Sequence, residues 1–150
     1  MTKKESNIHE LFMIQVLKTA DVIRFRLSAL LKDYELTMPQ YNILRILRGA
    51  KGAISLGQVK ERMHFDTSDV SRLVDRLVKK GIVARNICPD NRRKLDVCIS
   101  DEGLNILKEL DGKMHENLDG FFKDFYSEAK AKEMTELLSQ IKYVKEPVLK

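Results

Sequence analysis

The chain has 150 residues, of which 43% are hydrophobic and 33% are charged. This length allows one compact domain with a buried core and extensions, and the balance of residues argues against a disordered chain. No stretch approaches the roughly 18 apolar residues of a membrane span, and the N-terminus lacks the pattern of a secretory signal peptide. Two cysteines are too few for a disulfide framework or a closed zinc site. We therefore expect a cytoplasmic protein.

The positive charge is concentrated in the middle of the chain. Residues 41–100 hold 13 basic and 6 acidic groups, whereas residues 101–150 hold 8 basic and 11 acidic groups. A basic block inside a folded domain indicates a polyanionic partner, most commonly nucleic acid. The alternative is a charged surface that only contacts solvent.

The first predicted element is a long helix from about Ile8 to Leu31, a segment without Gly or Pro. One stripe of apolar side chains runs along it, and further apolar residues lie beside that stripe. A helix with more apolar surface than one core face needs usually packs against two neighbours. We expect one neighbour to be its own domain and the other a partner subunit.

Two short helices are predicted next. Thr37 as the N-cap and Pro39 in the first turn are start signals for a helix that ends near residues 49–52, where two glycines stand. Ser55 is the predicted N-cap of a third and very short helix.

A fourth helix is predicted from about Thr67 to Lys80, before Gly81. Its candidate N-caps are Asp66, Thr67 and Ser68. Its predicted buried face consists of Val70, Leu73, Val74 and Leu77. Its other face is polar and consists of Ser68, Asp69, Ser71, Arg72, Asp75, Arg76 and Lys79.

After Gly81 the spacing of apolar residues changes from that of a helix to that of strands, which predicts a two-stranded hairpin. Residues 82–87 and 95–99 read as its strands, and residues 89–91 as a turn signal. Its tip is basic and consists of Arg92, Arg93 and Lys94. With Cys88 opposite Leu95, Cys98 would lie about three residues further along, too far for a disulfide at roughly 3.4 Å per residue.

Two helices complete the predicted chain. Ser100 is the expected cap of the fifth helix, which runs to about Leu118. Three phenylalanines extend the apolar face of this helix. The last helix covers about residues 127–144. The fold class is therefore mainly α with a small β-hairpin wing. Three short helices followed by a hairpin give the order of a winged helix-turn-helix, here flanked by N- and C-terminal helices.

This order suggests a mode of DNA binding. An α-helix fits the major groove, and its N-terminal residues reach base edges. We expect Ser68, Ser71 and Arg72, with Thr67 beside them, to lie on bases, and Arg76 and Lys79 to meet phosphates. Arginine on a slender projection suits the narrow minor groove, which is the role expected of the wing residues Arg92, Arg93 and Lys94.

The sequence resembles the MarR-type transcriptional regulators, most specifically over residues 36–103. The resemblance rests on Leu36-Thr37 with Pro39-Gln40-Tyr41, on Ser71-Arg72-Leu73-Val74-Asp75-Arg76-Leu77, on Lys80-Gly81-Ile82-Val83, on Asn91-Arg92-Arg93 and on Ile99-Ser100-Asp101-Glu102-Gly103. Three positions depart from the family pattern. Asn91 stands where Asp is usual, Ser100 replaces the more usual Thr, and Asp69 puts a carboxylate on the expected DNA face. Asp69 would either accept from a cytosine amino group or, as we favour, act only as a helix N-terminal charge.

The resemblance implies a homodimeric regulator, expected to be a repressor, on a pseudo-palindromic operator with half-sites about 10 base pairs apart. Residues 1–35 would form an N-terminal dimerisation helix, residues 36–100 the DNA-binding region, and residues 101–150 C-terminal dimerisation helices. Many relatives release DNA when a small lipophilic or phenolic ligand binds, and others when a cysteine is oxidised.

Two other functions stay open at this stage, namely redox sensing through Cys88 or Cys98 and protein binding by the winged helix. The histidines and acids lack metal-ligand spacing, and no catalytic motif or phosphate-binding loop is recognisable. We therefore expect no enzyme activity, no metal and no cofactor.

Overall fold

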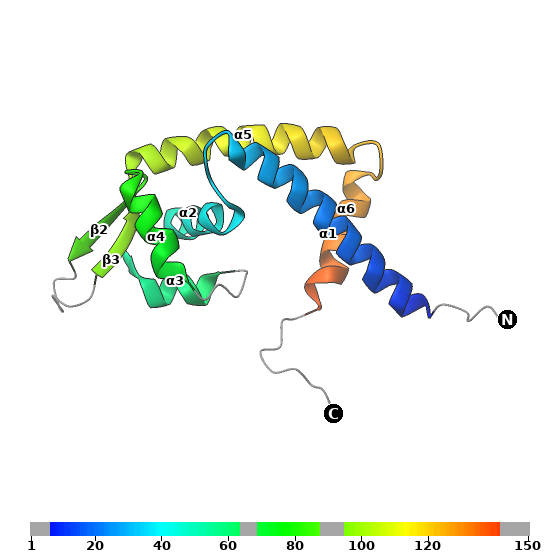
Figure 1. The fold of residues 1–150 in the computed structure, drawn as a ribbon. Coiled ribbons are helices and arrows are strands. Elements are labelled where there is room, and N and C mark those ends of the chain that lie inside the picture. Colours follow the sequence, from blue (N-terminus) through cyan, green and yellow to red (C-terminus); the bar gives the residue numbers. More distant parts are fainter. Residues whose placement is uncertain (1–6, 64–68, 88–94, 142–150) are drawn as a thin grey trace, which may run out of the picture. The chain divides into compact units, whose positions relative to one another are not determined.

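The computed structural model describes residues 7–63, 69–87 and 95–141. The chain forms two compact units, Met1–Lys113 and Met114–Lys150, and helix α5 runs through the boundary between them. Figure 1 shows the elements in chain order. They are α1 (Ile8–Lys32), α2 (Met38–Ala50), β1 (Ile54–Ser55), α3 (Leu56–Arg62), α4 (Val70–Lys79), β2 (Val83–Ile87), β3 (Leu95–Ile99), α5 (Asp101–Phe122) and α6 (Glu128–Ser139). None of these described helices is long and apolar enough to cross a membrane.

The mainly helical fold with a small wing sheet is confirmed, but the sheet has three strands rather than the two that we predicted. The strands are antiparallel in the order β1-β3-β2, and Ile54 of β1 lies opposite Val97 of β3. A strand of two residues is too short to show the alternation of apolar and polar side chains from which strands are predicted.

The predicted hairpin register was wrong by one residue. Ile87, and not Cys88, lies opposite Leu95, which places Cys98 opposite Ala84. Cys88 itself lies outside the described residues. The register of a hairpin depends on its turn, and the turn signal in the sequence did not specify the closing pair.

The core of the first unit lies between α2, α3, α4 and the sheet. Each of these elements contributes fully buried aliphatic side chains, because each has its apolar residues on one face. Those with almost no exposure are Ile43, Leu44, Leu47, Val59, Val74, Leu77 and Val97. This packing holds α4 by one face only and leaves its other face to solvent.

The helix starts were well predicted where a single capping residue was available. Thr37 and Gln40 form a reciprocal capping box at the start of α2, and Ser55 and Gln58 form another at the start of α3. The end of α2 differs slightly from the prediction, because its C-cap is Lys51 in a left-handed conformation with φ of 54° and not a glycine.

Gly81 ends α4 and turns the chain into β2. Its φ is +75°, and the two hydrogen bonds from Gly81 N to the Val78 carbonyl and from Ile82 N to the Leu77 carbonyl form a Schellman motif. The hydroxyl of Ser100 donates to the Gly81 carbonyl over 2.7 Å. The end of α4 is thereby tied to the start of α5.

Ser100 also caps α5, as predicted, since its hydroxyl oxygen accepts a hydrogen bond from the backbone N–H of Gly103 over 3.1 Å. In the second unit, Ser127 caps α6 and accepts from the N–H of Lys130. The predicted continuation of α6 to residue 144 extends outside the described residues, within which the helix ends at Ser139.

Candidate nucleic-acid interface

Helix α4 separates apolar from basic side chains as the sequence predicts. Of the four residues of its predicted buried face, Val70, Val74 and Leu77 are buried, whereas Leu73 is only half-buried. The opposite face is exposed and carries Ser71, Arg72, Arg76 and Lys79. The four predicted contact residues that the structure describes on this helix therefore share one solvent-accessible surface, with three positive charges.

The N-terminus of α4 lies later than we predicted. Its N-cap is Asp69, whose Oδ1 accepts a hydrogen bond from the backbone N–H of Arg72 over 3.3 Å, so the candidate caps at residues 66–68 were wrong. Several consecutive residues have side-chain oxygens that can cap a helix, and the sequence offered no means to choose among them. The capping role agrees with the reading of Asp69 as a helix N-terminal charge.

Asp69 also forms an ion pair with the side chain of Arg72. Its Oδ2 lies 3.2 Å from Arg72 Nε, and the side chain of Arg72 is 80% exposed. One carboxylate thus contacts both the backbone and the side chain of the residue that we expected to read a base. The sequence alone did not predict this pair, because Asp69 and Arg72 were interpreted as separate surface charges.

A second ion pair joins α4 to the sheet. The carboxylate of Asp75 pairs with the guanidinium of Arg85, which lies on β2. Both side chains are partly covered, with exposures of 42% and 33%. The pair fixes the strand that leads into the wing against the helix. The sequence carried no signal for it, since the two residues are ten positions apart on different elements.

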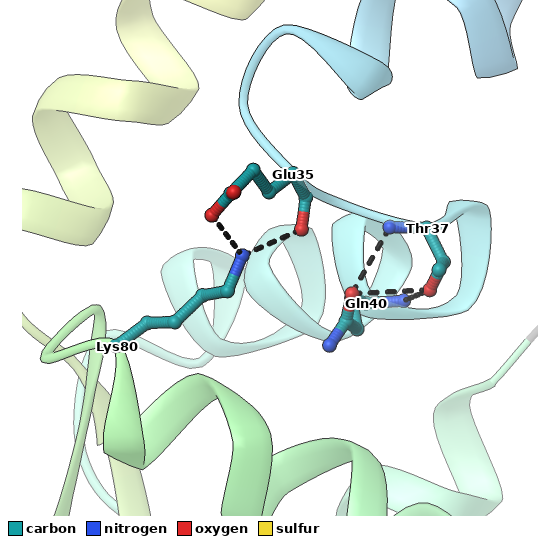
Figure 2. A network of polar contacts seen from close by, with 4 residues as sticks. All are labelled: Glu35, Thr37, Gln40 and Lys80. Atoms are coloured by element: carbon teal, nitrogen blue, oxygen red, sulfur yellow. Dashed lines mark hydrogen bonds and ion pairs between the residues drawn. The ribbon is translucent and has the colours of Figure 1, made fainter.

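The end of α4 is also tied to the segment between α1 and α2. Figure 2 shows the Nζ of Lys80 reaching the backbone carbonyl of Glu35 over 2.6 Å and its carboxylate over 3.2 Å. Glu35 has a left-handed backbone with φ of 51°. Two residues further on, the Thr37–Gln40 capping box begins α2. These contacts anchor the C-terminal end of the basic helix.

The remaining predicted contact residues cannot be placed. Thr67, Ser68, Arg92, Arg93 and Lys94 lie outside the described residues. Cys98 is a half-buried free thiol whose sulfur accepts a hydrogen bond from Asn86 over 3.6 Å. Within the described part of the chain, no group of three or more His, Cys, Asp or Glu residues could hold a metal ion.

Two tyrosines of the first unit are held by other protein groups. Tyr41 on α2 is buried, and this burial raises its pKa above the usual value of 10.0, so that the phenol is neutral at physiological pH. The hydroxyl of Tyr34 donates to the carboxylate of Glu109 over 3.2 Å. Arg48 of α2 pairs with Asp111 of α5 at 2.5 Å.

Helix α4 is basic and exposed, follows the short helix α3, and leads into a small antiparallel sheet. This arrangement defines a winged helix-turn-helix protein. A sequence profile described as the MarR family matches residues 36–95. The chain is 29% identical over 109 residues to the uncharacterized HTH-type transcriptional regulator YsmB of Bacillus subtilis, an alignment that covers 73% of this chain and 74% of that protein.

Solved structures extend the comparison. The MarR transcription factor of Planctomyces limnophilus is 30% identical, with a TM-score of 0.66 and coverage of 93% of this chain and 98% of that one. The BpsR protein of Bordetella bronchiseptica, whose DNA binding is regulated by 6-hydroxynicotinic acid, shares the fold, with a TM-score of 0.71, 22% identity and coverage of 94% and 96%. The chain belongs to the MarR family of transcriptional regulators, which bind DNA through a winged helix-turn-helix.

Proposed function

We propose that the protein is a homodimeric repressor that acts in the cytoplasm on a pseudo-palindromic operator in double-stranded DNA. The observation that carries this proposal is the exposed face of α4, where Ser71, Arg72, Arg76 and Lys79 lie together. Its buried face is anchored in the core, so the helix presents this surface as a rigid element. A rigid basic helix has the shape and charge to enter the major groove.

The position of each side chain along α4 supports its proposed role. Ser71 and Arg72 lie in the first turn, where residues of a recognition helix meet base edges. We propose the same base-reading role for Thr67 and Ser68. Arg76 and Lys79 lie one and two turns further and would contact phosphates. The wing residues Arg92, Arg93 and Lys94 would enter the adjacent minor groove.

The surface of α1 supports a dimer. Large apolar side chains are exposed along the first two-thirds of this helix, with exposures from 37% to 77%. They are Ile8, Leu11, Phe12, Met13, Ile14, Val16, Leu17, Val22 and Phe25. Apolar patches of this extent usually mark a protein interface. We assign residues 1–35 and 101–150 to dimerisation and residues 36–100 to DNA binding.

A small-molecule effector is a further part of the proposal. The Bordetella regulator with the same fold responds to 6-hydroxynicotinic acid, a small hydroxylated aromatic acid. We propose that this protein releases its operator when a small lipophilic or phenolic ligand binds.

The experiment that tests the proposed function is selection of DNA from a random duplex pool by the purified protein at near-physiological salt. Enrichment of an inverted repeat with half-sites about 10 base pairs apart is the expected result. A promoter carrying that repeat should then give less transcription when the protein is present. Recovery of no preferred sequence would contradict the proposal and favour a winged helix that binds another protein.

Two single substitutions on α4 separate base reading from phosphate contact. Arg72→Ala should reduce discrimination at one base pair of each half-site by about 1–3 kcal/mol. Arg76→Ala should weaken binding to all sequences alike and lower the slope of log K against log salt by about one. Titrations of operator and random duplex at several salt concentrations measure both effects. The role assignments are wrong if the two variants behave identically.

A further inference from the structure

We propose that Asp69 is a specificity-determining residue, because its carboxylate orders the Arg72 side chain for end-on contact with a guanine. This inference rests on the proposed function and deepens it, since it assigns a role in base reading to an acidic residue on the DNA face. The two contacts of the Asp69 carboxylate carry the argument.

The Asp69 carboxylate contacts Arg72 at two points. Oδ1 of Asp69 accepts from the backbone N–H of Arg72 over 3.3 Å, while Oδ2 lies 3.2 Å from Arg72 Nε. The cap holds the carboxylate in place relative to the helix, and the carboxylate in turn holds the inner edge of the guanidinium. The Arg72 side chain is therefore directed by the helix itself and not by the rest of the protein.

The guanidinium of Arg72 has more N–H donors than Asp69 engages. An arginine has five N–H donors in a planar fork, one of them on Nε and four on the two terminal nitrogens. Among the described residues, Asp69 is the sole ion-pair partner of Arg72, and it engages Nε. The terminal nitrogens are left for O6 and N7 of a guanine, which accept a bidentate contact from arginine.

The Asp69–Arg72 ion pair is exposed to solvent. With side-chain exposures of 80% for Arg72 and 48% for Asp69, the ion pair adds little to the stability of the fold. Its benefit appears on binding, because an unrestrained arginine must lose rotamer freedom when it meets a base. The Asp69 carboxylate also repels the DNA phosphates. This repulsion makes binding less favourable wherever no contact between Arg72 and a base offsets it.

The test is the substitution Asp69→Asn, which keeps a good helix cap and removes the charge. The quantity to measure is a ratio: the dissociation constant for the operator with the guanine read by Arg72 replaced in each half-site, divided by the dissociation constant for the selected operator. That guanine is identified as the position at which Arg72→Ala loses its preference. We expect Asp69→Asn to reduce the ratio by about two- to tenfold, the cost of ordering one long side chain, while its affinity for random DNA rises.

The chain contains a matched control. Asp21 and Arg24 on α1 form an exposed pair with the same three-residue spacing and an N–O distance of 3.1 Å. Asp21→Asn changes the net charge equally and should leave the ratio unchanged. In an Arg72→Lys background, which lacks the planar fork, Asp69→Asn should no longer change the ratio. Circular dichroism melting of each variant confirms that α4 remains folded.

Each other outcome overturns the inference. If Asp69→Asn weakens both duplexes by the same factor, Asp69 is only a helix cap. If its ratio equals that of the wild type, or if Asp21→Asn lowers the ratio as much, the pair has no role in base reading. In these cases the wild type still selects an operator and the proposed function stands. A wild type that selects no DNA rejects both.

Discussion

Gly103 lies in the first turn of α5, where a side chain has no room. A Cβ at this position would contact the backbone carbonyl oxygen of Ile82 and approach Cγ1 of Ile99 to 2.7 Å. The glycine lets α5 begin directly against the turn between α4 and β2. The motif Ile99-Ser100-Asp101-Glu102-Gly103 noted in the sequence is thus a packing requirement as well as a helix start.

Gly103→Ala should therefore destabilise the protein by about 2–3 kcal/mol, because the carbonyl is backbone and cannot move aside. Gly112 on the same helix is the control, since a Cβ there meets nothing within 4 Å. Gly112→Ala should stabilise the helix by about 0.5–1 kcal/mol. Urea unfolding of the two variants should show shifts of opposite sign, and shifts of equal sign would contradict this account of the site.

Tyr41 gives a prediction for alkaline pH. Its pKa is raised in the folded protein by burial, so above pH 10 the unfolded chain releases this proton more readily than the folded one. The tyrosine's contribution to stability is present at neutral pH and is lost as the pH rises above about 10. Tyr41→Phe should flatten the fall in melting temperature between pH 9 and 11 relative to the control Tyr126→Phe. Parallel curves for the two variants would be evidence against the shift.

At the scale of elements, the sequence predicted the order of helices and strands and the buried face of α4. Those predictions depend on the spacing of apolar residues and on single capping residues, which are local signals. It failed at β1, which is two residues long, and at the cap of α4, where several consecutive residues were candidates. The ion pairs of α4 with β2 and with the α1–α2 segment depend on how elements pack, and the sequence contains no local signal for that.

The contact of Lys80 with Glu35 fixes the end of α4. Lys80→Met removes both the ion pair and the bond to the carbonyl, and we expect a loss of about 1 kcal/mol, or roughly 3 °C in melting temperature. Lys79→Met, on an exposed neighbouring residue, is the control and should change stability by less than about 0.5 kcal/mol. Calorimetry of the two variants would contradict the anchoring role if their melting temperatures agreed.

At the scale of the whole molecule, the exposed apolar side chains of α1 predict assembly. Leu17 is 59% exposed in the single chain. In the proposed dimer, Leu17→Glu would bury a charge, which should weaken dimerisation by about a hundredfold or more. Gln15→Glu adds the same charge at a position that is already polar and should have a much smaller effect. Sedimentation equilibrium over a range of concentrations measures both, and a wild type that stays monomeric would contradict the prediction.

The sequence revealed the function class of the molecule more completely than its candidate site. Arg72, Arg76 and Lys79 were recognised as a basic face because charge and helical spacing are visible in one segment. The pairing of Asp69 with Arg72 was missed although the residues are three apart, because the two were interpreted as separate surface charges. Spacing alone shows that two side chains are neighbours on a helix, but it does not show that they pair with each other.

The two hydrogen bonds of Lys80 to Glu35 make residues 35 and 80 differ in how well they tolerate mutation. The shorter bond reaches a backbone carbonyl, which every amino acid supplies, so replacement of Glu35 leaves it in place. The requirement at residue 35 is instead for a left-handed backbone, which glycine and asparagine meet more easily than glutamate. Residue 35 therefore tolerates any side chain that is compatible with a left-handed backbone, whereas residue 80 keeps the contact only with a long side chain that ends in a cation.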